Sequence, residues 1–295
     1  KDSAGKPVAS VPLYMSQDNS LIGETDEIGV LKTDKFNKEG LTASDYVIYA
    51  KDKNGGLSFE YKLSVFAPQG ELNGMPYNVR FNTVEKLASQ KNITWFSNPL
   101  NDKKQTIKYR ESGSQEWKTA DAKTQQVDFN TSGNYIVNVN AVNLEGLKAD
   151  TTYEYVLGTD EAVLEAATFK TGQEGKKTNE FFIIGDIQDP DKSRVEEVAS
   201  QLDAKNHNYD FGITIGDAID QASNYTDWSD LGQVLGADML GGTNMVNIMG
   251  NHEYYGDSSA ATASAIYNNP NTKEGGYYSF EYNDVYVAVI NFSNT

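Results

Sequence analysis

The chain has 295 residues, a formal net charge of −17 and no cysteine, and 38% of its residues are hydrophobic. A chain of this length is expected to form two or three domains, with enough apolar content for packed cores. The negative charge argues against a nucleic-acid-binding surface, because phosphate backbones are bound by positively charged faces. Without cysteine there are no disulfides and no cysteine-ligated metal sites. No apolar stretch reaches about 18 residues, so no membrane span is expected.

Residues 1–72 are the least informative part of the chain. They contain one clear hairpin signal, in which alternating apolar residues flank Asn54-Gly55-Gly56. Such a turn between alternating runs is typical of paired antiparallel strands. We therefore expect an N-terminal β-rich segment, to which the sequence assigns no role.

Residues 73–172 contain short alternating runs separated by turn residues at nearly regular intervals. This pattern predicts an antiparallel β-sandwich. Trp95 stands in the middle of one run and is expected to anchor the core, because large aromatic side chains are mostly buried. The polar segment 171–180 reads as a linker to the next domain. The runs are YNVRFNTV, NITWFS, QTIKYRES, NYIVNVNAV, TTYEYVLG and AATFKT.

Residues 173–295 change pattern to apolar runs that alternate with helical stretches. The runs FFII, GITI and VNIM are each followed directly by a glycine and then by Asp186, Asp217 or Asn251. About thirty residues separate successive runs, which is room for one strand–helix–strand crossover. A mostly parallel sheet covered by helices is therefore predicted. A final hairpin is expected around Asn283-Asp284.

The polar residues after these strands predict a metal site. In open α/β sheets, ligands bind beyond the carboxyl ends of the strands, and a preceding glycine lets the backbone turn sharply. Two carboxylates, a carboxamide and His252 at one edge suit hard or borderline metal ions. A metal pair bridged by a carboxylate can activate water and hold a phosphoryl group. The other histidine, His207, is expected to lie in a surface loop.

Three blocks carry a resemblance to a known family. Asp186, the run GDAID at 216–220 and the run GNHE at 250–253 resemble the first three blocks of the calcineurin-like metallophosphoesterases. The stretch at 144–155 resembles part of the fibronectin-III-like N-terminal domain of purple acid phosphatases. The resemblance implies a β-sandwich followed by a partial α/β metallophosphoesterase domain, an αββα sandwich whose C-terminal part is absent.

The resemblance also implies roles for individual residues. Asp186 would bind the first of two divalent or trivalent metal ions, which would be iron, manganese or zinc. Asp217 would bridge both metals, and Asn251 would bind the second. His252 would contact the substrate phosphoryl group or protonate the leaving group. Glu253 would support the loop rather than bind metal.

Two positions depart from the family pattern. Gln188 stands where many members have histidine, and Asp220 stands where purple acid phosphatases have a metal-bound tyrosine. Without that tyrosine no tyrosinate-to-iron charge-transfer colour is expected from this position. Either Gln188 or Asp220 could take the place of the missing metal ligand, and a carboxylate is the better cation ligand.

The third departure is the absence of any histidine after His252. The family completes its metal site with later histidines, so the ligand set here is expected to be incomplete. The chain is therefore expected to be a truncated or clipped piece of a longer enzyme. The missing C-terminal part of the domain, as a separate chain, is a candidate partner that would cover apolar surface.

The leading hypothesis is metal-dependent hydrolysis of phosphate esters, as a phosphatase or phosphodiesterase, at a dinuclear centre. The alternative is a non-catalytic cell-surface binding module with a vestigial metal half-site. A nucleotide-binding α/β protein is disfavoured because no glycine-rich phosphate loop follows the first strand. The acidic composition and the sandwich resemblance favour a secreted or cell-surface location.

Overall fold

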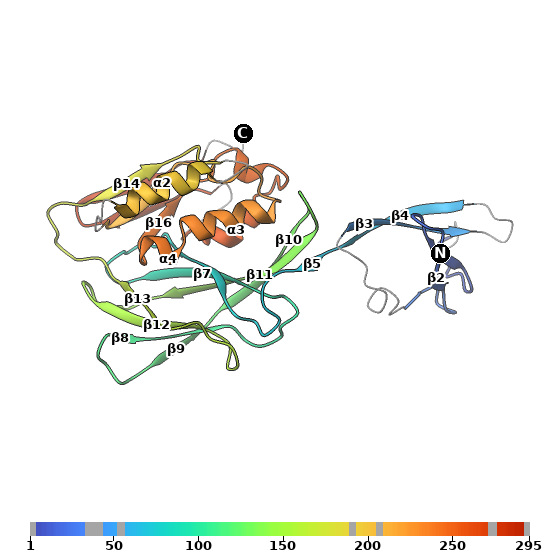
Figure 1. The fold of residues 1–295 in the computed structure, drawn as a ribbon, viewed down its shortest axis with the longest axis horizontal. Coiled ribbons are helices and arrows are strands. Elements are labelled where there is room, and N and C mark those ends of the chain that lie inside the picture. Colours follow the sequence, from blue (N-terminus) through green and yellow to red (C-terminus); the bar gives the residue numbers. More distant parts are fainter. Residues whose placement is uncertain are drawn as a thin grey trace. The chain divides into compact units, whose positions relative to one another are not determined.

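The computed structural model describes residues 4–32, 44–51, 57–188, 193–204, 209–270 and 276–291. The chain divides into two compact units (Figure 1). The first comprises Lys1–Ala67 with Gly133–Tyr135, and the second comprises Pro68–Ser132 with Ile136–Thr295. The regions expected at 73–172 and 173–295 therefore lie together in the second unit. No helix in the described ranges is long and apolar enough to cross a membrane.

The first unit contains a four-stranded antiparallel sheet in the order β2-β1-β3-β4. The expected hairpin is confirmed, because β3 and β4 pair with Ile48 opposite Tyr61. Its turn at Asn54-Gly55-Gly56 lies outside the described residues. Tyr14 and Tyr49 stack on this sheet with ring centroids 5.5 Å apart. The strands are β1 (Pro12–Met15), β2 (Leu21–Glu24), β3 (Ser44–Lys51) and β4 (Leu57–Val65), and β5 (Ala67–Pro68) lies at the boundary between the units.

The β-sandwich of the second unit is built by the alternating runs. One layer has the order β10-β11-β7-β6 and the other β13-β12-β8-β9. Trp95 on β7 is 0% exposed, which confirms it as a core anchor, and its indole N–H donates to Gln105 Oε1 at 3.0 Å. The strands are β6 (Tyr77–Asn82), β7 (Lys91–Ser97), β8 (Thr106–Glu111), β9 (Lys118–Asp121), β10 (Lys123–Phe129), β11 (Tyr135–Leu144), β12 (Thr152–Gly158) and β13 (Ala167–Lys170).

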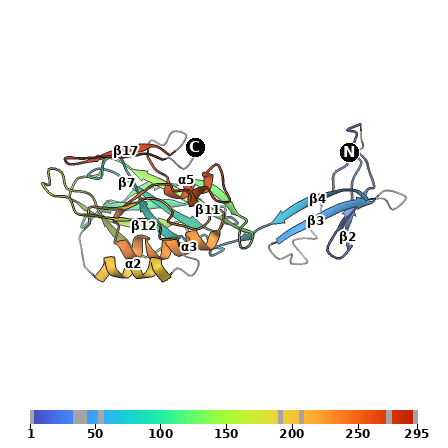
Figure 2. The same cartoon turned by 90° about the horizontal axis from the view of Figure 1, so that it is seen from above.

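The later residues form the predicted parallel strands with helices between them. β14 pairs in parallel with β15, and β15 with β16. Figure 2 shows α2 and α3 on one face of the sheet and β17 on the opposite face. The elements are β14 (Phe181–Ile184), α2 (Ser193–Ala204), β15 (Phe211–Thr214), α3 (Tyr225–Val234), α4 (Ala237–Leu240), β16 (Asn244–Asn247), the 3₁₀ helix η1 (His252–Tyr254), α5 (Ala261–Tyr267), β17 (Tyr278–Tyr282) and β18 (Val285–Val289).

The two regions of the second unit share one continuous sheet. β6 of the sandwich pairs in parallel with β16, with Met245 opposite Asn82. Buried amides join the strands, because Asn244 Nδ2 donates to Asn82 O at 2.6 Å and Asn247 Nδ2 donates to Asn82 Oδ1 at 3.0 Å. Buried polar groups are stable only when paired, so these bonds fix how the strands meet.

The start of the segment expected as a linker is instead fixed in place. Thr171 is buried and its hydroxyl donates to Lys148 O at 2.6 Å, and Gly172 N–H donates to Leu87 O at 2.9 Å. Further along, Lys176 Nζ pairs with Asp210 at 2.7 Å. The polar side chains of the segment therefore anchor it to both neighbouring regions. A flexible linker has the same polar composition, so composition alone does not separate the two cases.

One sheet face near β14 remains apolar and accessible. Ile183 is 55% exposed and Ile215 is 56% exposed, while β17 and β18 cover Phe211 and Val246 further along the sheet. A contiguous apolar face is unfavourable in water and commonly marks a contact surface.

Lys91, at the start of β7, is a buried cation. Its ammonium donates to Gly242 O at 2.8 Å and to Asn244 Oδ1. Burial lowers the pKa of Lys91 from 10.5 to about 7, because the ammonium loses its hydration. Between these two values the unfolded chain binds a proton at Lys91 that the folded chain does not.

The pH dependence of stability should reveal this group. Because the folded pKa is the lower one, the destabilisation by Lys91 is complete below about pH 7 and is relieved as the pH rises. Relative to Lys91→Met, the free energy of unfolding of the wild-type chain should rise by up to about 3 kcal/mol between about pH 7 and pH 9.5. Urea unfolding of both proteins measures this difference. A difference that does not change with pH would show that Lys91 stays charged when buried.

Candidate metal and phosphoryl site

Three loops meet at the carboxyl edge of the parallel strands. Asp186 follows β14, Asp217 follows β15 and Asn251 follows β16. The first two loops are joined by Ile187 N–H, which donates to Asp217 O at 3.1 Å. The second and third are joined by His252 N–H, which donates to Asp217 Oδ1 at 3.0 Å. The expected candidate residues therefore project from adjacent loops that touch through Asp217.

Glycine allows these loops to approach each other. A Cβ at Gly216, where φ is 97°, would lie 2.7 Å from Gly250 Cα, and a Cβ at Gly250 would lie 2.1 Å from Asp217 Oδ1. Asp186 and Asp217 have φ of 49° and 52°. Left-handed backbone costs a non-glycine residue about 1 kcal/mol and is concentrated at functional sites.

Glu253 holds two of the loops together. It is 0% exposed, and its carboxylate accepts the backbone N–H groups of Asp217, Ala218 and Gly250 at 3.1, 3.0 and 2.6 Å. Tyr267 on α5 donates its hydroxyl to the same carboxylate at 3.2 Å. Burial raises the pKa of Glu253, and the three backbone donors oppose that rise. The expectation that Glu253 supports the loop is confirmed. Nothing in the sequence indicated Tyr267.

The orientation of His252 is fixed by one hydrogen bond. Its Nδ1 lies 2.7 Å from the carbonyl oxygen of Asp220. A carbonyl oxygen only accepts hydrogen bonds, so Nδ1 must carry the proton of the neutral ring. Nε2 then carries the lone pair. The imidazole also packs against Tyr255 with ring centroids 4.5 Å apart, and Tyr255 Oη accepts from Asn251 Nδ2 at 2.9 Å. Asp220 thus orients His252 through its backbone.

Gln188 and Asp220 lie along one pocket beside these loops. The pocket has a volume of about 330 Å³ and also includes Asp227 and Asp230 in its lining. Burial raises the pKa of Asp227. The buried Oε1 of Gln188 accepts no hydrogen bond from the described residues. A buried acceptor without a donor is unfavourable, and a cation at this position would satisfy it.

The available donors fit part of a metal centre. Asp186, Asp217 and Asn251 carry side-chain oxygens of the kind that hard cations bind, and Gln188 carries a buried oxygen without a hydrogen bond from the described residues. Within the described ranges, no three or more histidine, aspartate or glutamate side chains lie close enough to hold a metal ion. A site for two metals would therefore need ligands beyond those that these loops bring together. His207 lies outside the described residues.

The fold and loops define a class of protein: a β-sandwich whose sheet continues into a parallel α/β layer with acidic strand-end loops. Residues 76–171 match the sequence profile described as "Purple acid Phosphatase, N-terminal domain". This region is therefore similar to the N-terminal domain of purple acid phosphatases. A search of the curated proteins gave no match.

Solved structures give more distant similarities. The structure of PhoD is 12% identical with a TM-score of 0.46, covering 77% of this chain and 54% of PhoD. The chain therefore spans about half the length of that protein. The chicken CNTN1 FN1–FN3 domains are 13% identical with a TM-score of 0.26, covering 55% of this chain and 53% of theirs. A two-domain fibronectin type III segment of chicken tenascin is 12% identical with a TM-score of 0.21, covering 56% of this chain and 88% of that segment.

Gln188 offers a direct test of cation binding. Gln188→Glu should increase the affinity of the chain for Mn²⁺ about tenfold, because a carboxylate replaces a carboxamide ligand, and Gln188→Ala should reduce it about tenfold. Isothermal titration with Mn²⁺ measures both changes. Gln115→Glu, on an exposed turn, adds the same charge elsewhere and should leave the affinity unchanged. Equal affinities for the two Gln188 variants would exclude this side chain as a ligand.

Proposed function

We propose that this chain carries the N-terminal portion of a centre for metal-dependent hydrolysis of phosphate esters. One observation carries the proposal: Asp186, Asp217, Asn251 and His252 lie on adjacent loops at one edge of a parallel sheet. The purple acid phosphatase N-terminal profile over residues 76–171 supports it. Monoesters and diesters are both candidate substrates, because a fold does not determine the substrate.

Each residue has a role in this proposal. Asp186, Asp217 and Asn251 would hold the two iron, manganese or zinc ions, with Gln188 or Asp220 as a further ligand. Bound metals supply Lewis acidity and a water of lowered pKa. His252 keeps its Nδ1 proton on the Asp220 carbonyl, so its Nε2 can take up a second proton and, in the imidazolium form, donate it to the leaving oxygen or to a phosphoryl oxygen. Glu253 holds the loops that carry Asp217 and Asn251 together through its backbone hydrogen bonds.

The remaining ligands come, in this proposal, from a further polypeptide segment of the same domain. That segment packs on the apolar face that includes Phe181, Ile183 and Ile215, which are exposed here. Burying the exposed part of these side chains favours association, since moving a whole side chain of this kind out of water gains about 1.5–3 kcal/mol. A secreted or cell-surface location is part of the same proposal.

Metal stoichiometry tests the proposal first. After gel filtration, elemental analysis of the 295-residue chain should find at most one weakly held metal, and nitrophenyl phosphate esters should not be hydrolysed. A longer protein that includes these residues and later histidines should bind two metals and hydrolyse a mono- or diester. Two tightly bound metals in the 295-residue chain would contradict the ligand set proposed above.

A non-catalytic binding module with a vestigial half-site is the second candidate. It is favoured by the lack, among the described residues, of a cluster of three metal-binding side chains. The double variant Asp217→Asn/Asn251→Ala in the longer protein separates the two candidates. Loss of hydrolysis supports the catalytic centre, and unchanged hydrolysis excludes it.

A further inference from the structure

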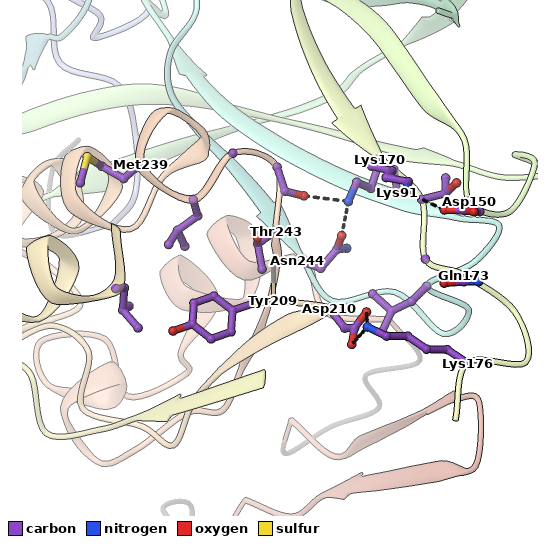
Figure 3. A pocket seen from close by; sticks show the side chains of 17 residues that line it. Lys91, Asp150, Lys170, Gln173, Lys176, Tyr209, Asp210, Met239, Thr243 and Asn244 are labelled. Atoms are coloured by element: carbon purple, nitrogen blue, oxygen red, sulfur yellow. Dashed lines mark hydrogen bonds and ion pairs between the residues drawn. The ribbon is translucent and has the colours of Figure 1, made fainter. Parts of the chain in front are cut away.

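A second pocket lies in the same unit, where the sandwich meets the α/β layer. Its volume is about 530 Å³, within the range of small-molecule sites. Segments of both regions line it, among them the start of β7, the end of β13 with the residues that follow, the residues just before β15, and the end of α4 with the loop to β16 (Figure 3). The lining includes Lys91, Lys170, Gln173, Lys176, Asp210 and Asn244.

This pocket is distinct from the candidate metal site. Asp210 precedes β15 and Asn244 begins β16, whereas Asp217 and Asn251 follow the same two strands. A strand of four residues spans about 13 Å, so the two sites lie at opposite ends of the parallel strands. A ligand in this pocket would therefore not reach the strand-end loops.

Lys91 is the charged group at the bottom of the pocket. Its residue is 3% exposed, and its ammonium donates to two neutral acceptors, Gly242 O at 2.8 Å and Asn244 Oδ1. It also lies over the rings of Phe81 and Phe169, 5.0 and 5.5 Å from their centroids. Within the described part of the chain no carboxylate pairs with it. Two acceptors leave one of the three ammonium protons for a ligand.

The other charges of the pocket are already paired. Lys170 Nζ lies 2.6 Å from Asp150 Oδ1, and Lys176 Nζ lies 2.7 Å from Asp210 Oδ2. Below about pH 7, where Lys91 keeps its proton, three lysines and two aspartates leave one positive charge, on Lys91, in a chain of net charge −17. A buried charge without a counter-ion is costly, so an anion entering the pocket would remove that cost.

We propose that this pocket binds a small oxyanion, phosphate or carboxylate, with the Lys91 ammonium as its charge partner. The neighbouring ion pairs supply further lysine donors at the rim. They also place carboxylates of Asp150 and Asp210 there, which disfavour multiply charged ligands by repulsion. The volume leaves room for an organic group attached to the oxyanion.

The test uses the full chain after removal of metal by chelation, so that phosphate cannot bind through metal at the strand-end loops. Inorganic phosphate and acetate are titrated separately at constant ionic strength and about pH 6, where Lys91 is protonated and phosphate is mostly a monoanion, while backbone amide resonances are recorded. Saturable shifts at Gly242 and Asn244 support the proposal. Whether phosphate or acetate produces them shows which of the two oxyanions the pocket binds. Shifts confined to Gly216 and Gly250, or shifts that do not saturate, overturn it.

Charge variants give the second measurement. Lys91→Met should weaken oxyanion binding about tenfold or more, because it removes a charge-assisted hydrogen bond. Lys118→Met, on an exposed strand of the sandwich, should leave binding unchanged.

Gln173 allows the same test without disturbing the buried lysine. It is exposed at the rim, so its variants are expected to fold even if Lys91→Met does not. Gln173→Glu should weaken and Gln173→Lys should strengthen oxyanion binding, each about threefold, by changing the local charge. Equal affinities across the wild type and these two variants would overturn the proposal.

Discussion

Replacing Asp217 with asparagine is expected to reduce phosphate ester hydrolysis by the complete centre about a thousandfold. Such a loss corresponds to about 4 kcal/mol of transition-state stabilisation, which is the scale of a lost metal contact. Asparagine keeps the size of the side chain, and its Oδ1 can still accept the His252 N–H that Asp217 Oδ1 accepts at 3.0 Å. The fold should therefore persist while the charge that holds the metals is lost.

The measurement is kcat/KM on a phosphate ester together with metal content for the same preparation. Both should fall, and the urea midpoint should change little. Asp102→Asn, in the exposed loop between β7 and β8 of the sandwich, removes the same charge elsewhere and should have no effect on hydrolysis. Full activity in Asp217→Asn would remove this residue from the catalytic centre.

Glu253→Ala is expected to lower the free energy of unfolding by about 4 kcal/mol. The carboxylate accepts three backbone N–H groups and the Tyr267 hydroxyl. Its removal leaves buried donors without acceptors, each of which costs about 1–3 kcal/mol, and a small cavity. The loops that carry Asp217 and Asn251 would lose the group that fixes their separation, so cation affinity should fall as well.

Two matched variants separate the loop contacts from general effects. Tyr267→Phe removes one donor to Glu253 and should cost about 1 kcal/mol. Glu116→Ala, on an exposed turn of the sandwich, should change stability by less than about 0.5 kcal/mol. If Glu253→Ala unfolds at the wild-type urea concentration, then Glu253 does not support the loops.

Local patterns predicted the elements that local chemistry determines. Alternating apolar residues predicted the sandwich strands and the buried Trp95, and the continuous apolar runs predicted the parallel strands β14, β15 and β16. The Gly-Asp and Gly-Asn steps located the loops that approach each other, because glycine allows backbone positions that a Cβ would block. Whether these loops bind metal remains a prediction.

Other features depend on contacts between residues far apart in sequence. The sequence by itself determined which segments become strands and helices and which strand ends carry oxygen ligands, because periodicity and turn residues act over a few neighbours. Only the tertiary structure decided that β6 pairs with β16, that Tyr267 reaches Glu253 and that Lys91 is buried against the loop before β16. These pairings follow from how whole layers pack, and a lysine or tyrosine looks the same in sequence whether packing leaves it in water or buries it.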